Sequence, residues 1–303
     1  MTAQSSSNSW IAVDWGTTHL RAWRMSGSAP QDQASSDEGM ANVQPGRFEP
    51  ALLRVIGSWL GSDPVTVLAC GMVGARQGWI EAPYRPVPAK PTELPPIEVP
   101  CADPRLRVQI MPGLSQSAPP DVMRGEETQI AGYLATNPGW DGVLCLPGTH
   151  TKWVHVSAGE VVSFQTFMTG ETFALLSDRS VLRHSVATSE LDASEFLDAA
   201  EDAMSHPERL TARLFGLRAR DLLEDVAPAT ARARLSGLLI GAELAAARPY
   251  WLGQNVAVIG SDTLSRLYDS ALSRMGVPAE RTDATALTLA GLTAAFQTQE
   301  LSG

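Results

Sequence analysis

The feature that most constrains the fold is a local pattern that occurs twice, once near the start of each half of the chain. In residues 10–24 an apolar run is followed by Asp14 and by a turn containing Gly16, after which polar and apolar residues alternate. In residues 142–156 an apolar run is followed by a turn containing Gly148 and by a second alternating segment. Short apolar runs are typical of buried strands, and alternation is typical of half-buried strands. Each copy therefore predicts a β-hairpin with a glycine at its tip.

The tips of both hairpins have the chemistry of a phosphate site. A glycine lets the backbone approach a ligand closely, and successive N–H groups in such a turn can bind an anion. Phosphates would repel the Asp14 carboxylate unless a cation lay between them, and Mg²⁺ favours one or two carboxylates together with phosphates and water. The sequence therefore predicts Asp14 as a metal ligand beside a phosphate chain, although an ordinary turn is the alternative for either tip alone. The predicted phosphate-binding residues are Gly16, Thr17, Thr18, Gly148, Thr149 and Thr151.

Size and composition indicate an ordinary globular protein of two domains. The chain has 303 residues, of which 44% are apolar and 18% charged, as in typical globular proteins. The break at Asn137-Pro138-Gly139 predicts α/β domains over residues 1–137 and 138–303. A net charge of −10 argues against a nucleic-acid partner. No apolar run approaches the roughly 20 residues of a membrane helix, and no signal segment or disulfide framework is visible. We therefore expect a cytoplasmic protein with no membrane partner.

A second predicted strand of the first half also ends in a glycine-rich loop. Residues 65–70 form a continuous apolar run, and residues 71–79 contain three glycines, an arginine, a glutamine and a tryptophan. In open α/β sheets, ligands bind at the carboxyl ends of strands. The loop therefore contributes a set of predicted substrate-binding residues, which are Gly71, Met72, Arg76, Gln77 and Trp79.

Two other segments of the first half are predicted to be non-helical, the first a loop and the second an extended connector with short strands such as Leu106 to Met111. Residues 26–46 are polar and are expected to form a loop. Residues 83–120 hold eleven of the 21 prolines, which exclude a helix because proline fixes φ and removes a hydrogen-bond donor. This stiff connector could form a wall of the substrate pocket or a structural wrap across the first domain.

The helix predicted over residues 123–136 begins with two acids. Glu126 and Glu127 follow Arg124 and Gly125 at its start. Acids in a first turn stabilise the helix dipole by roughly 0.3–1 kcal/mol, and this is the structural alternative. In the functional interpretation one of the two is a general base that faces a pocket.

The second half contains further candidates. Glu171 begins a predicted helix and is a second-choice base, although a first-turn acid is the favoured interpretation. Gly260-Ser261 lies between an apolar strand and a helix, where a ligand can approach the helix N-terminus. Gly237 and Gly241 predict close packing of a long helix, and small residues predict close packing of the closing helix from residue 284, at a domain interface.

With these segments placed, the chain resembles the 2-dehydro-3-deoxygalactonokinase family. The matching stretches are Asp14-Trp15-Gly16-Thr17-Thr18, Cys70-Gly71-Met72-Val73-Gly74 with Gln77-Gly78-Trp79, Met123 to Gln129, Leu146 to Trp153, and Phe167 to Glu171. The resemblance implies two ribonuclease H-like, actin-like ATPase domains, whose mixed sheets are flanked by helices and whose cleft binds ATP. It also implies phosphorylation of the C6 hydroxyl of 2-dehydro-3-deoxy-D-galactonate with ATP and Mg²⁺. In family terms Gly260 and Ser261 would lie at the adenosine.

The mechanism that we expect for such a kinase extends the list of site residues. Glu126 or Glu127 would take the proton of the sugar hydroxyl, and Lys152 would neutralise phosphoryl charge unless it is an outward strand residue. The sugar acid's carboxylate would be gripped by Arg76 or Arg124, because arginine can bind a carboxylate through two parallel hydrogen bonds. Trp79 and Tyr84 would form walls for the sugar chain.

Two departures from the superfamily pattern and three alternatives accompany this hypothesis. Pro147 stands where many superfamily members carry an acid, and a single glycine, Gly260, stands where a Gly-Gly pair is common. The alternatives are a kinase for the gluconate epimer or another sugar acid, a phosphoanhydride hydrolase of the exopolyphosphatase type, and a non-catalytic actin-like binding protein. A homodimer is one option for its assembly.

Overall fold

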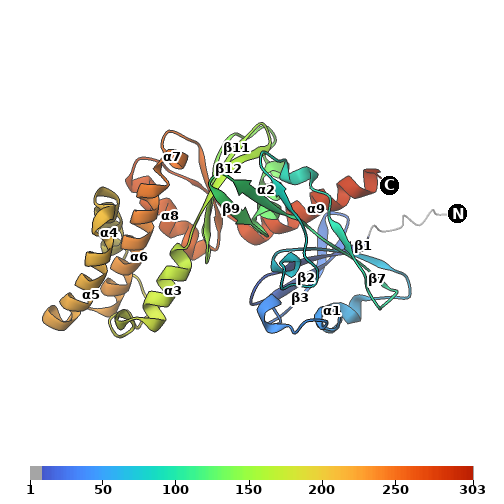
Figure 1. The fold of residues 1–303 in the computed structure, drawn as a ribbon, viewed down its shortest axis with the longest axis horizontal. Helices are drawn as coiled ribbons and strands as arrows, with labels where there is room; N and C mark the ends of the chain where they lie inside the picture. Colours follow the sequence, from blue (N-terminus) through green and yellow to red (C-terminus); the bar gives the residue numbers. More distant parts are fainter. Residues whose placement is uncertain (1–8, 303) are drawn as a thin grey trace. The chain divides into compact units, whose positions relative to one another are not determined.

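The computed structural model describes residues 9–302, which divide into two compact units. Among these residues, unit 1 comprises the chain up to Trp140, the short segment Ser157–Val162 and the residues from Ala284 onward, whereas unit 2 comprises Asp141–Val156 and Ser163–Asp283. Figure 1 traces the chain through its elements. No helix among residues 9–302 combines the length and apolar character needed to span a bilayer.

Unit 1 is built on a six-stranded mixed sheet in the order β3-β2-β1-β4-β7-β6. β1 pairs antiparallel with β2 and parallel with β4, and β4 in turn pairs parallel with β7. The predicted first hairpin is therefore confirmed. The strands are β1 (Ser9–Trp15), β2 (Leu20–Ser26), β3 (Ala29–Ser36), β4 (Val65–Cys70), β6 (Ile97–Val99) and β7 (Leu106–Ile110).

A second sheet, most of which belongs to unit 2, has the same strand order. Its five strands follow the order β12-β11-β10-β13-β14. β10 pairs antiparallel with β11 and parallel with β13, and β13 pairs parallel with β14, as in unit 1. The duplication that the two hairpins predicted thus extends to whole sheets. The strands are β10 (Gly142–Leu146), β11 (Thr151–Ser157), β12 (Glu160–Phe167), β13 (Val256–Gly260) and β14 (Glu280–Asp283).

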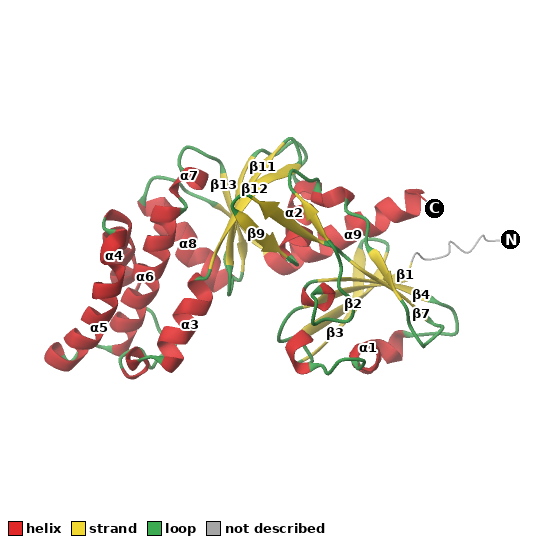
Figure 2. Cartoon of the chain, in the orientation of Figure 1, coloured by secondary structure: helices red, strands yellow, loops and turns green. Residues whose placement is uncertain are grey.

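Helices cover these sheets, and a small third sheet occupies the proline-rich segment (Figure 2). The third sheet has the order β5-β8-β9, with β5 (Tyr84–Pro86), β8 (Gly113–Ser117) and β9 (Pro120–Met123). Unit 1 holds α1 (Phe48–Ile56), α2 (Glu126–Thr136) and α9 (Ala284–Ser302). Unit 2 holds α3 (Thr169–Arg179), α4 (Ala193–Ser205), α5 (Leu210–Glu224), α6 (Pro228–Ala246), α7 (Arg248–Trp251) and α8 (Asp262–Arg274).

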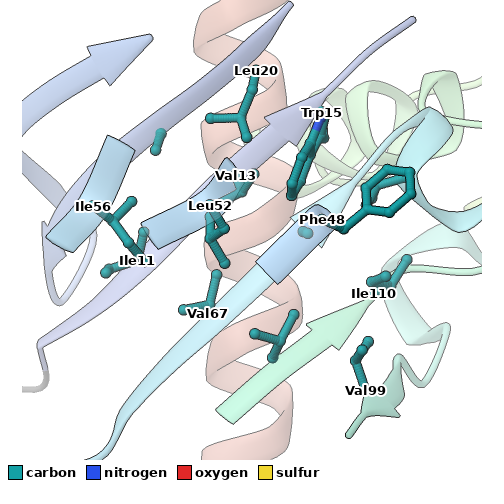
Figure 3. Close-up of a cluster of buried hydrophobic side chains, with 14 of the residues drawn as sticks. Ile11, Val13, Trp15, Leu20, Phe48, Leu52, Ile56, Val67, Val99 and Ile110 are labelled. Carbon is teal, nitrogen blue, oxygen red and sulfur yellow. The ribbon is translucent and has the colours of Figure 1, made fainter. Parts of the chain in front are cut away.

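The core of unit 1 forms where α1 packs on the six-stranded sheet (Figure 3). Alternate residues of β1, Ile11, Val13 and Trp15, point into this cluster and meet Phe48 and Leu52 of α1. Their period of two is the periodicity of a strand, and the cluster fixes the strand that ends beside Asp14.

Helix α9 packs against α2 at very short range. A Cβ at Gly291 would overlap the carbonyl oxygen of Thr128, and a Cβ at Gly132 would overlap that of Leu287. The closing helix therefore joins unit 1, where Phe296 also stacks on Trp10 with ring centroids 4.5 Å apart. The sequence predicted close packing of this helix at a domain interface, whereas the helix that it contacts so closely, α2, belongs to the same unit.

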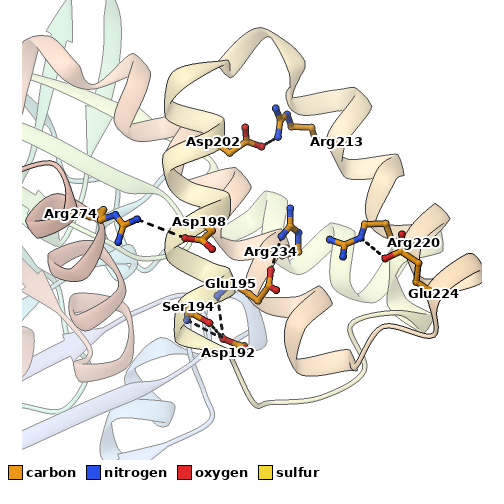
Figure 4. A network of polar contacts seen from close by, with 10 residues as sticks. All are labelled: Asp192, Ser194, Glu195, Asp198, Asp202, Arg213, Arg220, Glu224, Arg234 and Arg274. Carbon is orange, nitrogen blue, oxygen red and sulfur yellow. Dashed lines mark hydrogen bonds and ion pairs between the residues drawn. The ribbon is translucent and has the colours of Figure 1, made fainter.

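Helices α4, α5 and α6 of unit 2 are joined by close packing and ion pairs (Figure 4). A Cβ at Gly237 or Gly241 would overlap backbone oxygens of α4, which confirms the close packing predicted for these glycines. Arg234 of α6 donates to Glu195 of α4 at 2.6 Å between Nη1 and Oε2.

The prediction that residues 26–46 form a loop was wrong for Ala29–Ser36, which form the edge strand β3. This strand is largely exposed and contains no apolar alternation, so hydrogen bonding to β2 holds it in place. The compact units begin to separate near Trp140, close to the predicted break, but α9 lies in the first unit rather than with residues 138–283.

Candidate active site

In unit 1 the predicted metal ligand, Asp14, lies near the end of a central strand. Asp14 stands opposite Arg21 in the β1–β2 register, and the Arg21 guanidinium forms an ion pair with its Oδ2. A second Arg21 nitrogen donates to the hydroxyl of Thr285 at 3.0 Å. The Asp14 side chain is about one-fifth exposed (19%), so it can meet a ligand while Arg21 fixes its orientation.

The turn that follows Asp14 is supported from behind by a second backbone segment. The N–H groups of Gly39, Met40 and Ala41 donate to the carbonyl oxygens of Thr18, Gly16 and Thr17, at 3.1, 2.9 and 3.0 Å. A Cβ at Gly39 would overlap the backbone of Thr18, so only glycine permits this contact. Thr17 and Thr18 remain exposed at the tip, as a phosphate turn requires.

Two glycines bring the loop after β4 and the start of α2 beside Asp14. Gly71 has a φ of 93° and Gly125 a φ of 105°, both in the region that favours glycine. A Cβ at Gly71 would lie 3.5 Å from Asp14 Oδ1, and a Cβ at Gly125 would lie 3.3 Å from the Gly71 Cα. The structure thus assembles Asp14, Gly71 and the acids of α2 in one place.

The two acids at the start of α2 have different environments. Glu127 is 1% exposed, and its two carboxyl oxygens accept hydrogen bonds from the Gly125 N–H at 2.9 and 2.7 Å. Burial, and then the charge of Glu126, raise the pKa of Glu127 to about 8. Glu126 is half-buried, and its Oε2 accepts from the Arg124 N–H at 3.1 Å. At neutral pH, therefore, Glu127 is a protonated group that supports the loop.

Among the predicted substrate residues, Arg124 has a charged side chain that the structure buries. Its side chain is 8% exposed, its Nη2 donates to the Ala82 carbonyl at 2.7 Å, and its guanidinium lies over the Tyr84 ring at 4.2 Å from the centroid. The Nε and Nη1 atoms are buried with no hydrogen-bond partner among the described residues. Buried donors without an acceptor cost stability, so an acceptor that a ligand brings to these atoms would be favoured.

The remaining predicted substrate residues have other positions. Arg76 is exposed and lies 3.5 Å from Glu81, and Gln77 is exposed as well. Trp79 packs edge-on against Trp15, at 6.1 Å between ring centroids, as part of the unit 1 core. Met72 begins a short 3₁₀ turn and is half-buried.

In unit 2 the second phosphate turn contacts the first residues of α3. A Cβ at Gly170 would overlap the Gly148 carbonyl oxygen, and the Glu171 N–H donates to the Thr149 carbonyl at 2.9 Å. The Glu171 carboxylate in turn lies 2.6 Å from His150 Nε2. Glu171, the second-choice base, therefore bonds to the turn, and Gly148 and Thr149 are held against a helix N-terminus, which favours anions.

Two predicted site residues on β11 are buried. Lys152 is 4% exposed, which contradicts the alternative of an outward strand residue. Thr151 is buried, and its hydroxyl lies 3.0 Å from the Tyr268 hydroxyl. Thr151 is therefore placed behind the turn rather than at its tip.

A cavity of about 180 Å³ opens within unit 2 beside this turn, and its lining is mainly apolar. Gly148 and Gly170 line it next to Phe173 and Arg232, whose guanidinium lies 4.8 Å from the Phe173 ring centroid. The predicted adenosine residue Gly260 lies outside this lining but against the turn, since a Cβ there would be 3.1 Å from Pro147 Cγ. Ser261 is exposed as the N-cap of α8, whose residues Thr263, Leu264 and Leu267 line the cavity.

The donor set fits Mg²⁺ that arrives with a nucleotide. Among residues 9–302 no cluster of three or more His, Cys, Asp or Glu could hold a metal ion by itself. At the first phosphate turn Asp14 provides a partly exposed carboxylate, and Mg²⁺ is commonly bound through one or two carboxylates plus substrate phosphates.

Several of these residues were missed by the sequence analysis. Arg21 was detectable, because a four-residue tip over 16–19 places it opposite Asp14. Phe173, Arg232 and Tyr268 come from three helices, and no local pattern connects them.

Comparisons with known proteins agree with this geometry. The model of the 2-keto-3-deoxy-galactonokinase family matches residues 14–295. A probable 2-dehydro-3-deoxygalactonokinase of Rhizobium meliloti is 38% identical, over 94% of this chain and 96% of that protein. The 2-dehydro-3-deoxygalactonokinase of Escherichia coli K12 is 34% identical, over 88% of this chain and 90% of that protein.

Solved structures support the same fold. The crystal structure of a candidate 2-dehydro-3-deoxygalactonokinase from Sinorhizobium meliloti superposes with a TM-score of 0.90 at 37% identity, covering 96% of this chain and 99% of that one. The ADPNP-bound activator of 2-hydroxyisocaproyl-CoA dehydratase from Clostridium difficile has a TM-score of 0.52 at 11% identity, covering 97% and 96%. At this low identity the similarity confirms the predicted actin-like ATPase fold class and shows nothing about function. On its sequence match over most of its length, the chain belongs to the 2-keto-3-deoxy-galactonokinase family.

Proposed function

We propose that the chain is an ATP-dependent kinase that phosphorylates the C6 hydroxyl of 2-dehydro-3-deoxy-D-galactonate to the 6-phosphate in galactonate breakdown. The observation that carries this proposal is the family match over residues 14–295, because it includes both phosphate turns and the Arg-Gly-Glu-Glu segment. A cytoplasmic location, where ATP is available, is part of the same proposal.

ATP is the phosphoryl donor in this proposal. The cavity of unit 2 would take the nucleoside, because it is mainly apolar and is bordered by Gly148 of the second phosphate turn. Mg²⁺, when bound, would neutralise charge on the phosphates, and Asp14 would hold it directly or through water. Lys152, buried on the strand that follows the second turn, would add positive charge near the phosphates.

Glu126 is the proposed general base. Glu127 is buried, is engaged with the Gly125 N–H through both oxygens, and is neutral at pH 7 because its pKa is about 8. A base must reach the hydroxyl it deprotonates, and half-buried Glu126 can do so where fully buried Glu127 cannot. Glu127 instead fixes the turn at Gly125 from which Glu126 projects.

Arg124 is the proposed partner of the sugar acid's carboxylate. Its Nε and Nη1 atoms lack hydrogen-bond partners among the described residues, and a carboxylate can accept from two guanidinium nitrogens at once. The Tyr84 ring covers one face of the guanidinium and is itself 37% exposed, so we expect it to shift when the substrate binds. Arg76 is exposed beside Glu81, so solvent can accept hydrogen bonds from its guanidinium without a substrate.

The test is ADP release by the purified protein with Mg²⁺-ATP and a panel of acceptors. The panel contains 2-dehydro-3-deoxygalactonate, its gluconate epimer, plain hexoses and no sugar. Release with the galactonate-derived acid, at a higher kcat/KM than with its epimer, is the expected result. Preference for the epimer would change the named substrate, and sugar-independent phosphate release would instead indicate a phosphoanhydride hydrolase.

Matched variants test the base. Glu126→Gln should lower kcat by about 10²–10⁴-fold, the range of general base catalysis. Glu127→Gln, which keeps an oxygen to accept from Gly125, should stay within about threefold of the wild type, because it removes no charge that is present at pH 7. The reverse order of effects would transfer the role to Glu127.

A further inference from the structure

A buried carboxylate lies behind the cavity of unit 2. It belongs to a residue to which no contact with substrate, metal or phosphate has been assigned above. Glu243 of α6 is 3% exposed and lies among core residues. Ionised carboxylates are rarely buried unless hydrogen bonds compensate them. Its partners therefore explain why an acid is tolerated there.

Glu243 accepts hydrogen bonds from three other elements of unit 2. Trp153 Nε1 of β11 donates to Oε1 at 2.8 Å, and the Tyr268 hydroxyl of α8 donates to Oε2 at 2.8 Å. The hydroxyl of Thr169, the first residue of α3, also bonds to the carboxylate. Burial raises the pKa of Glu243 to about 6, while these donors oppose the rise, so the group is charged at neutral pH.

These partners surround the second phosphate turn. The Tyr268 hydroxyl lies 3.0 Å from that of Thr151, where the chain leaves the turn for β11. Thr169 precedes Gly170, which contacts the Gly148 carbonyl so closely that no side chain fits between them. Thr169 and Tyr268 also line the cavity, so one carboxylate bonds to both sides of its wall.

We propose that Glu243 is a positioning residue for the nucleotide: by accepting from Thr169 and Tyr268, it fixes the N-terminus of α3 and the start of β11 around the turn 147–150. This inference rests on the proposed function, in which the cavity binds ATP. Glu243 acts through Thr169 and Tyr268 and does not touch the ligand.

A purely structural role would not need a charge. Replacing buried ionic groups by apolar residues of similar size is often neutral or stabilising. A carboxylate can accept from several donors at fixed angles, whereas an apolar side chain would remove the acceptor of the Trp153 N–H and of the Tyr268 and Thr169 hydroxyls. The geometry therefore favours a role in which the positions of those donors matter.

The experiment is a double-mutant cycle on nucleotide affinity, measured by calorimetry with Mg²⁺-ADP and no sugar acid. Glu243→Gln leaves a single acceptor oxygen, and Thr169→Val removes the hydroxyl while keeping the side-chain shape. Each should weaken ADP binding by about tenfold, and the double variant should be little weaker than either, because both remove one coupled contact. Thr169→Ser, which keeps the hydroxyl, should bind within about twofold of the wild type.

The control is Glu195→Gln, which breaks a half-buried ion pair between α4 and α6 outside the cavity (Figure 4). It should leave ADP affinity unchanged. In turnover assays Glu243→Gln should raise KM for ATP about tenfold and leave KM for the sugar acid unchanged, a difference that general destabilisation would not produce.

Independent, multiplicative effects in the cycle would overturn the inference, as would equal ADP affinities for the Ser and Val variants at position 169. Equal affinities of the Ser and Val variants would refute the inference even if Glu243→Gln does not fold. Failure of the proposed function has a different signature, because wild-type protein that binds ADP but turns over no sugar acid would leave the cycle measurable.

Discussion

Glu127 gives the sharpest test of the electrostatics in unit 1, through the pH dependence of stability. Its pKa rises from 4.5 to about 8 on folding, so between these values the folded state holds a proton that the unfolded state has lost. The stability that Glu127 contributes must therefore fall as pH rises through this range, by up to about 1.4 kcal/mol per pH unit. This contribution must level off above pH 8. The Glu127→Gln variant cannot titrate there. The free energy of unfolding of the variant, relative to that of the wild type, should therefore rise by about 3.5 kcal/mol from pH 5 to pH 8.

The assay is hydrogen exchange of the amides in residues 126–136, corrected for the pH dependence of the intrinsic exchange rate. It reports the opening free energy of α2 whether or not unit 2 unfolds at the same time. Other titrating groups, including Glu243, are present in both proteins and cancel in the difference. A difference between variant and wild type that stays constant from pH 5 to pH 8 would refute the claim that Glu127 is protonated in the folded protein.

Three further substitutions, the first with a matched control, test other contacts. Gly291→Ala should destabilise unit 1 by about 1–3 kcal/mol in urea unfolding, because its Cβ would overlap the Thr128 carbonyl. The control Gly216→Ala, at an open helix position, should instead stabilise the protein by up to about 1 kcal/mol. Equal effects of the two substitutions would contradict the packing argument. Asp14→Asn should lower kcat by about 10²-fold or more while the fold, followed by circular dichroism, is kept; near-normal turnover would exclude it as the metal ligand. Arg124→Lys should raise KM for the sugar acid about tenfold or more at unchanged KM for ATP, and a change confined to KM for ATP would refute the assigned carboxylate contact.

The hairpins were predictable because their signals are local. An apolar run, Asp14 and a glycine turn specify β1 and its tip within a dozen residues. An apolar run and a glycine turn likewise specify β10 and the start of β11. The repeated pattern then predicted two similar sheets. The edge strand β3 was not predictable, because its sequence is polar on both faces and only pairing with β2 selects the extended conformation.

Long-range packing set the other limit. The small residues of α9 were recognisable, but nothing local identifies α2 as the helix they contact. The same applies to the cavity of unit 2, whose lining comes from segments separated by about a hundred residues. Glu243 is an intermediate case, because an acid in the apolar stretch Leu238 to Ala247 is conspicuous, yet its donors Trp153 and Tyr268 become neighbours only in the fold.

The two units share one further feature that was not predicted from the sequence, a buried acid that accepts a hydrogen bond at the start of a helix. In unit 1 the Glu127 carboxyl group accepts from the N–H of Gly125 at the start of α2, and in unit 2 the Glu243 carboxylate accepts from Thr169 at the start of α3. Each acid is buried, so neither can contact solvent, and each fixes a helix N-terminus, a place that favours anions. Their pKa values, about 8 and about 6, differ because Glu243 has several side-chain donors while Glu127 also lies beside the charge of Glu126. Near pH 7, therefore, Glu243 is mostly charged and Glu127 is mostly neutral. Hydroxyls and an indole N–H compensate the negative charge behind the second turn, whereas a charge on Glu127 would face that of Glu126.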